Sequence, residues 1–102
     1  MAFIALEKLH QLYDGYRRVF KLGGRDWILL QEDGRVYCIA NQCPHLQAPL
    51  HRAIISNHQL RCPAHGIAFN LRDGLAVNPL SCRHALTYLP LIYEANQVGV
   101  DA

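Results

Sequence analysis

The sequence predicts an all-β fold, an antiparallel sandwich or barrel, on three observations. Short strand-like runs recur along the chain, separated by turn signals about every eight to twelve residues. The turn signals are pairs of Gly, Asp or Asn with small or polar neighbours, such as Gly23-Gly24 and Asp73-Gly74. The apolar fraction of 51% in 102 residues is enough for one core. Residues 1–102 are therefore expected to form a single domain.

The first part of the chain is expected to form a strand, a short helical turn at residues 7–12, and then three further strands. Gly23-Gly24 is a hairpin turn candidate, and the turn at residues 32–34 closes the next hairpin. The strands predicted here are residues 1–6, 16–22, 26–31 and 35–40. The last of them delivers the chain into the first of two loops that carry the candidate ligands.

Alternation within residues 35–40 places Val36, Cys38 and Ala40 on one face and Tyr37 and Ile39 on the other. Cys38 is therefore expected to be a buried free thiol.

In the second part of the chain, further strands are predicted around the second candidate ligand loop and a later irregular stretch. Ser56-Asn57-His58 reads as a hairpin turn that delivers the chain into the second candidate ligand loop, and residues 78–85 read as an irregular stretch opened by Asn78-Pro79. Residues 94–96 turn the last hairpin. The strands predicted here are residues 53–55, 59–61, 67–71, 75–77, 87–93 and 97–100.

Composition and charge exclude several classes of function. The net charge of +2 is small and no basic stripe or polybasic run is present, so neither nucleic acid nor a membrane surface is an expected partner. No apolar stretch approaches the roughly 20 residues of a membrane span, and Glu7 and Lys8 interrupt the short apolar run at the N-terminus. We expect a cytoplasmic protein, in which the four cysteines stay reduced.

Two short clusters, Cys43-Pro44-His45 and Cys62-Pro63-Ala64-His65, each hold one Cys and one His. Proline fixes φ and glycine permits φ above zero, so the two prolines and Gly66 indicate loops held in bent shapes. The candidate metal ligands are Cys43, His45, Cys62 and His65. Zinc accepts two Cys and two His, but zinc fingers group their cysteines in one cluster, whereas here each cluster is mixed. Mixing suits a binuclear cluster in which one iron takes both cysteines and the other takes both histidines.

These motifs resemble those of the Rieske [2Fe–2S] proteins. The resemblance extends to Gly34-Arg35-Val36-Tyr37, to residues 69–74, and to Asn78-Pro79, which falls where the family has a proline loop that shields the cluster. It implies a Rieske-type antiparallel β-sandwich with a cluster-binding subdomain at about residues 41–80, made of two ligand loops and the proline loop. It also implies one [2Fe–2S] cluster, with Cys43 and Cys62 on the buried iron and His45 and His65 on the outer iron.

The resemblance further predicts a low reduction potential. High-potential Rieske proteins carry a disulfide between the loops, and the matching positions here are Ala48 and Ala64. They also carry Ser and Tyr hydroxyls that donate to sulfur, and the matching positions here are Ile67 and Phe69. Donors to sulfur stabilise the reduced cluster, so their loss lowers the potential. We expect the low end of the Rieske range, about −150 mV.

The function implied is that of a soluble Rieske ferredoxin of the ring-hydroxylating oxygenase type, an electron-transfer component and not itself an enzyme. The donor would be an NAD(P)H-dependent flavin reductase and the acceptor a terminal oxygenase. A small Rieske-like subunit of an assimilatory nitrite reductase and a structural zinc module remain alternatives. The expected environment of the cluster comprises Leu46, Gln47, Ala48, Ala64, Gly66, Ile67, Phe69 and Pro79. The expected docking surface comprises Leu46, Gln47, Ala48, Pro49, Gly66, Ile67 and Pro79.

The remaining Cys, His and Trp residues are assigned ordinary structural roles. Cys82 is expected to be a plain loop cysteine, and Trp27 a core residue. Near the proline loop, a charge reversal at Arg83 is expected to affect turnover more than one at Arg25. Histidines expected to lie at the surface or in hydrogen bonds are His10, His51, His58 and His84.

Overall fold

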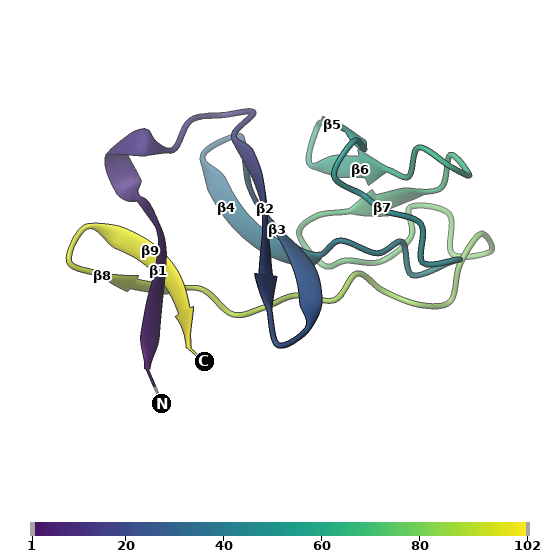
Figure 1. The fold of residues 1–102 in the computed structure, drawn as a ribbon. Coiled ribbons are helices and arrows are strands. Elements are labelled where there is room, and N and C mark those ends of the chain that lie inside the picture. The colour runs from purple at the N-terminus through teal and green to yellow at the C-terminus, as the bar shows by residue number, and fades with distance from the viewer. Residues whose placement is uncertain (1, 102) are drawn as a thin grey trace.

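The computed structural model describes residues 2–101, and within this range the regular secondary structure is almost wholly antiparallel strand. These residues form nine strands and one short helix, and Figure 1 labels the strands along the ribbon. Their bounds are β1 Phe3–Lys8, η1 Leu9–Gln11, β2 Arg17–Leu22, β3 Arg25–Glu32, β4 Arg35–Ala40, β5 Ile54–Ser56, β6 Gln59–Arg61, β7 Ala68–Asn70, β8 Ile92–Glu94 and β9 Gln97–Asp101.

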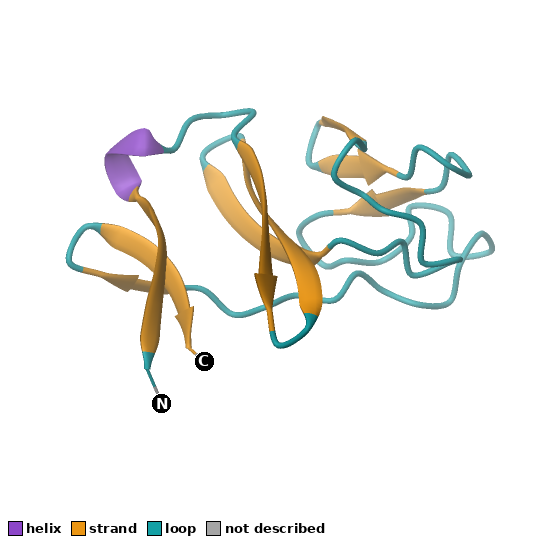
Figure 2. Ribbon diagram, in the orientation of Figure 1, coloured by secondary structure: helices purple, strands orange, loops and turns teal. Residues whose placement is uncertain are grey.

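The strands form three sheets of three strands each, in the orders β1-β9-β8, β2-β3-β4 and β5-β6-β7. In Figure 1 the β2–β4 sheet stands between the other two, and the chain returns from the β5–β7 side to the terminal sheet through a long irregular segment. Figure 2 shows that loops make up most of the β5–β7 side. The predicted all-β antiparallel fold is confirmed, with three small sheets.

The β2–β4 sheet is buried on both faces because two separate cores flank it. Ile28 and Ile39 belong to the core shared with Leu60 and Phe69 of the β5–β7 sheet. On the opposite face, the core contains Trp27, Leu29, Cys38, Ala40 and Val98. The predicted alternation along β4 is thus confirmed, and so are the buried positions of Cys38 and Trp27. Each fully buried Leu or Ile contributes about 1.5–3 kcal/mol to stability.

Two predicted strands are wrong over most of their length. Residues 75–77 make only one bridge, Ala76 to Phe69, because Asn78-Pro79 ends the pairing two residues later. Within residues 87–93, Tyr88 makes a single bridge to Ile39, and regular pairing resumes at Ile92. Pro90 interrupts this run because it has no N–H to donate to a ladder.

Other boundaries shift by one to three residues. The predicted helical turn is the three-residue η1, and β1 continues to Lys8. Met1, the first residue of the first predicted strand, lies outside the described residues, as does Ala102. Between residues 2 and 101, no helix has the length and apolar character needed to cross a bilayer.

Candidate metal centre

The two candidate ligand loops each follow a strand of the fold. The first ligand loop, residues 43–48, lies between β4 and β5, and the second ligand loop, residues 62–67, joins β6 to β7. Figure 1 places both at the end of the molecule remote from the chain termini.

The loops share one backbone hydrogen-bond pattern. In the first ligand loop, the N–H of Cys43 donates to the carbonyl of Ala48 at 2.7 Å, and the N–H of Gln47 donates to the carbonyl of Cys43 at 2.6 Å. In the second ligand loop, Cys62 donates to Ile67 at 2.9 Å and Gly66 donates to Cys62 at 2.8 Å. Each cysteine is therefore held at the base of a closed turn.

The four candidate ligands separate into a buried pair and an exposed pair. Cys43 and Cys62 are fully buried within the core shared by the β2–β4 and β5–β7 sheets. His45 and His65 are exposed, and their rings meet edge to face with centroids 5.4 Å apart. The structure thus brings the candidate ligands together as two pairs, with the cysteines inside and the histidines outside.

The electrostatics of the buried pair reflect close contact between the two thiols. Burial raises the pKa of the Cys43 thiol, and the neighbouring Cys62 thiol raises it further. The backbone N–H groups of His45 and Leu46 act in the opposite direction, because they donate hydrogen bonds to the Cys43 sulfur. These donors would stabilise a metal-bound thiolate in the same way.

This donor set fits a binuclear iron–sulfur cluster. Among residues 2–101, no three His, Cys, Asp or Glu side chains gather as ligands of a single ion. The side chains form two like pairs instead, and a Rieske cluster needs two cysteines on one iron and two histidines on the other. The buried sulfur, already supplied with two N–H donors, is suited to the iron on the protein side.

Arg17 and Asn41 fix the segment that leaves the first ligand loop. Nη1 of Arg17, on β2, donates to the carbonyl oxygens of His51 at 2.9 Å and Ala53 at 2.7 Å. Oδ1 of Asn41 accepts the N–H of Leu50 at 2.6 Å. Sequence reasoning missed both residues, since their partners are backbone atoms distant in the chain.

Sequence reasoning also missed the conformation of Gln47 and the contact of Arg61. Gln47 has φ of 61°, beside 70° for Gly66. Arg61 donates to the carbonyl of Gly66 at 2.6 Å, which places its guanidinium beside the second ligand loop. Gln47 and Gly66 each lie four residues after a candidate ligand cysteine. This shared offset was the sequence signal that could have predicted the conformation of Gln47.

The residues expected around the cluster occupy three kinds of position. Phe69 is fully buried and pairs with Leu60 across β6 and β7. Ala48 and Ile67 are half-buried against the same core. The exposed members are Leu46, Gln47, Pro49, Ala64, Gly66 and Pro79.

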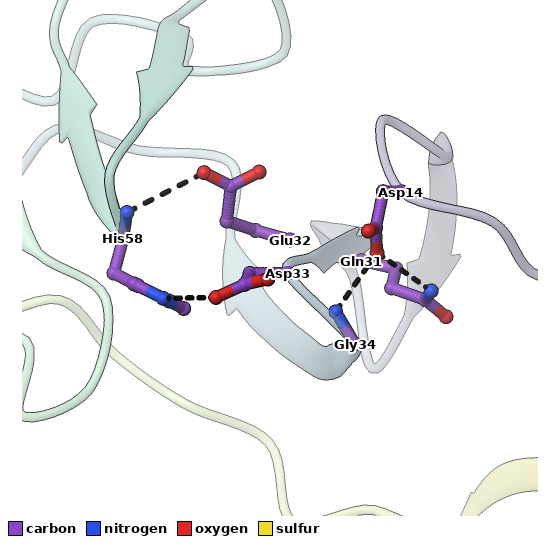
Figure 3. A network of polar contacts seen from close by, with 6 residues as sticks. All are labelled: Asp14, Gln31, Glu32, Asp33, Gly34 and His58. Carbon is purple, nitrogen blue, oxygen red and sulfur yellow. Dashed lines mark hydrogen bonds and ion pairs between the residues drawn. The ribbon is translucent and has the colours of Figure 1, made fainter.

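The other histidines and Cys82 take structural positions. Nε2 of His58 lies 2.9 Å from Oδ2 of Asp33, and its backbone N–H donates to Glu32, so this histidine joins β5–β6 to the β3–β4 turn (Figure 3). Nδ1 of His51 lies 3.3 Å from the amide of Asn41. Cys82 is half-buried, and His10 and His84 are exposed.

Comparison with known proteins gives the family. The family model of the Rieske [2Fe-2S] domain matches residues 2–90. The chain therefore belongs to the Rieske [2Fe–2S] domain family. The domain holds one [2Fe–2S] cluster per chain.

Curated relatives of this chain include a ferredoxin component and much longer proteins. The chain is 30% identical over 88 residues to the ferredoxin component of the alkene monooxygenase system of Xanthobacter autotrophicus, covering 85% of this chain and 70% of that protein. It is 35% identical over 63 residues to apoptosis-inducing factor 3 of Mus musculus, covering 62% of this chain. The matched region is 10% of that protein's length.

Solved structures share the fold. The ferredoxin of carbazole 1,9a-dioxygenase from Nocardioides aromaticivorans superposes with a TM-score of 0.81 at 22% identity, covering 98% of this chain and 97% of that one. A chain from a complex of reduced oxygenase and oxidized ferredoxin gives 0.79 at 20% identity, with coverage of 93% and 97%. A putative nitrite reductase NADPH small subunit gives 0.77 at 19% identity and covers both chains fully.

Proposed function

We propose that this chain is a single-electron carrier of the Rieske ferredoxin type, formed as a single domain over residues 1–102. Cys43 and Cys62 bind the inner iron, and His45 and His65 bind the outer iron. The observation that carries the proposal is the division of the ligands into a fully buried cysteine pair and an exposed histidine pair with rings 5.4 Å apart.

The chain's own residues supply two things to electron transfer. The core around the cysteines excludes water from the inner side, and the N–H groups of His45 and Leu46 donate to the Cys43 sulfur. The exposed imidazoles shorten the path to a docked partner. When bound, the cluster accepts and releases one electron, and neutral imidazole ligands give it a higher potential than four thiolates would.

The proposed electron donor is an NAD(P)H-dependent flavin reductase, and the proposed acceptor is a terminal oxygenase, both in the cytoplasm. Two likenesses support the acceptor: the ferredoxin component of an alkene monooxygenase system, and the oxygenase–ferredoxin complex of carbazole 1,9a-dioxygenase. The docking surface consists of the exposed residues around His45 and His65. It includes Leu46, which is 61% exposed. Redox encounters of this kind are small and transient, so a modest apolar patch is enough.

Metal and sulfide analysis, with EPR before and after dithionite, tests the ligand assignment and the redox role. We expect two irons and two sulfides per chain, and a rhombic signal that appears only on reduction. His45→Ala and Cys62→Ala should each abolish that signal, whereas His51→Ala, outside the ligand set, should keep it. One zinc per chain and no signal after anaerobic reconstitution would support the structural zinc module instead.

A bound subunit of an assimilatory nitrite reductase is the second candidate. It is favoured by one observation, the full-length superposition with a putative nitrite reductase small subunit. Size-exclusion chromatography with light scattering of the native complex in extracts distinguishes the two. A free ferredoxin migrates near its mass of 11.6 kDa, whereas a subunit co-migrates with a larger enzyme that reduces nitrite.

A further inference from the structure

Acidic residues are nearly absent from the long stretch that contains both ligand loops. Between Gly34 and Tyr93 the only acidic residue is Asp73, whereas the same stretch contains five arginines. Asp73 is engaged locally, because its Oδ1 accepts the N–H of Leu75 at 2.9 Å. No lysine follows Lys21, so the cations of this stretch are all guanidinium groups.

One of these arginines contacts the second ligand loop, and another lies near Pro79. Nη1 of Arg61 donates to the carbonyl of Gly66, the residue that follows His65. This contact holds a permanent positive charge at the second ligand loop without neutralising it, since a carbonyl carries no charge. Arg83 lines a cavity of about 590 Å³ together with Val77, Pro79 and the one carboxylate of this stretch, Asp73.

Exposed apolar side chains accompany the two arginines. Leu46 is 61% exposed, and Leu80, next to Pro79, is 93% exposed. Val77 in the cavity wall is half-exposed. We define the docking rim as Arg61 and Arg83, with Leu46, Val77 and Leu80 as its apolar part.

Carboxylates gather elsewhere in the molecule. Asp14 accepts hydrogen bonds from Gln31 and Gly34, and Asp33 faces His58, all at the β3–β4 turn (Figure 3). That turn lies at the far end of β4 from the first ligand loop. Asp14 and Asp33 therefore lie at the end of β4 remote from the first ligand loop, whereas Asp26, whose carbonyl accepts the N–H of Asn41, lies at the near end.

We propose that the redox partner of this chain docks with an acidic protein surface, whose carboxylates face Arg61 and Arg83 around an apolar centre. The proposal rests on the proposed electron-carrier function and adds the charge of its partner. Guanidinium groups bind carboxylates through two parallel hydrogen bonds, which suits a rim of arginines without lysine. Charges of opposite sign also accelerate encounter, and salt weakens this effect.

The test uses the reduced holoprotein and two acceptor proteins of opposite charge, an acidic plastocyanin and a basic cytochrome c. Stopped-flow oxidation is followed across a series of ionic strengths. The slope with salt is compared, because the absolute rates also depend on driving force. We expect the rate to plastocyanin to fall as salt rises, and the rate to cytochrome c to rise or stay flat.

Charge reversal of the rim locates the effect. Arg83→Glu and Arg61→Glu should each slow oxidation by plastocyanin at low salt by about three- to ten-fold, with the difference lost at high salt. Arg35→Glu, at the start of β4 near the carboxylates, is the matched control and should change the rate by less than about two-fold. Arg61 also supports the second ligand loop, so Arg61→Glu could alter the cluster itself. If Arg61→Glu changes the EPR signal, the test rests on Arg83→Glu alone.

Three results would overturn this inference while leaving the electron-carrier function intact. These are equal salt slopes for both acceptors, equal effects at Arg35 and Arg83, and preferential binding of phosphatidylserine vesicles over plastocyanin. A chain that takes up no electron from dithionite contradicts the proposed function itself, before any acceptor is added.

Discussion

Gln47 and Gly66 occupy the same place in the two ligand loops. Each lies four residues after a candidate ligand cysteine, donates its N–H to that cysteine's carbonyl, and has positive φ, 61° and 70° respectively. The left-handed region costs a non-glycine residue roughly 1–2 kcal/mol, whereas glycine enters it freely. The first ligand loop therefore carries a conformational strain that the second avoids.

Placing glycine at position 47 and a side chain at position 66 should change the stability of the holoprotein in opposite directions. Gln47→Gly should stabilise it by about 0.5 kcal/mol, since relieved strain exceeds the entropy cost of glycine. Gly66→Ala should destabilise it by about 1 kcal/mol. A Cβ at Gly66 would meet no atom within 4 Å, so that cost is conformational. Thermal unfolding followed at the cluster's visible absorption measures both, and equal shifts of the same sign would contradict the expectation.

A hydroxyl at position 67 should raise the reduction potential. The parent is expected near the low end of the Rieske range, about −150 mV, because Ile67 and Phe69 lack donors. Ile67→Ser should raise the potential by some tens of millivolts if its hydroxyl donates to a cluster sulfur. Ile55→Ser, half-buried against the same core, is the matched control. Spectroelectrochemical titration compares the three, and a larger rise in the control would contradict this role of position 67.

Removal of the Arg17 guanidinium should loosen the first ligand loop. Arg17→Met loses two charge-assisted hydrogen bonds to the carbonyls of His51 and Ala53, at a cost of roughly 1.5–3 kcal/mol. Iron release to a ferrous chelator should therefore accelerate. Arg18→Met, exposed on the same strand and donating to Leu6, is the control and should change the release rate little. A partial return in Arg17→Lys would support the hydrogen bonds as the cause.

Alkaline unfolding should show the ionisation of Tyr88. Burial is the main cause that raises the pKa of Tyr88 to about 12 from 10.0, and its hydroxyl donates to the carbonyl of Leu71. The folded state thus holds a proton that the unfolded state loses first. The contribution of Tyr88 to stability is full below pH 10 and declines as pH rises toward 12.

Tyr88→Phe should therefore be less stable than the parent at pH 7, by about 1 kcal/mol for the lost hydrogen bond. It should also lose less stability than the parent between pH 10 and 12. Tyr93→Phe, at an exposed position, controls for removal of a phenol. Chemical denaturation at several pH values measures the difference, and parallel profiles for parent and Tyr88→Phe would refute this account.

Thiol reactivity should separate the two cysteines outside the ligand set. Burial raises the pKa of Cys38 to about 12, and the residue is 1% exposed, so a disulfide reagent at pH 8 should leave it intact. Cys82 is half-buried and should react. The holoprotein should therefore yield one modified cysteine, identified as Cys82 by mass spectrometry, and Cys82→Ser should yield none until unfolded.

The sequence predicted the strands of the β2–β4 sheet well because their alternation and turn residues are local signals. It overestimated the strands at residues 75–77 and 87–93, where Pro79 and Pro90 limit pairing that apolar residues alone would favour. The four candidate ligands were predictable because Cys and His at fixed spacing are a chemical signature. Arg17 and Arg61 were not, since their hydrogen bonds to backbone carbonyls depend on how distant segments meet.

The structure shows that Arg25 is not a suitable control for a charge reversal at Arg83. Nη2 of Arg25 lies 3.3 Å from Oε1 of Gln42, and Arg25 lines a cavity with Cys43 and Pro44. Arg25 is therefore close to the first ligand loop and is a poor remote control for Arg83. Arg35 serves that purpose because it lies at the opposite end of β4.

The burial of β4 on both faces has a consequence for insertions and deletions. Tyr37 and Ile39 enter the core that contains the candidate ligands Cys43 and Cys62, whereas Cys38 and Ala40 enter the other core. Because side chains alternate with a period of two, a slip of one residue would exchange the contents of the two cores. Neither face of β4 is exposed to solvent. A single-residue deletion within β4 would therefore place small side chains beside the cluster, and an aromatic ring in the space that a cysteine side chain occupies.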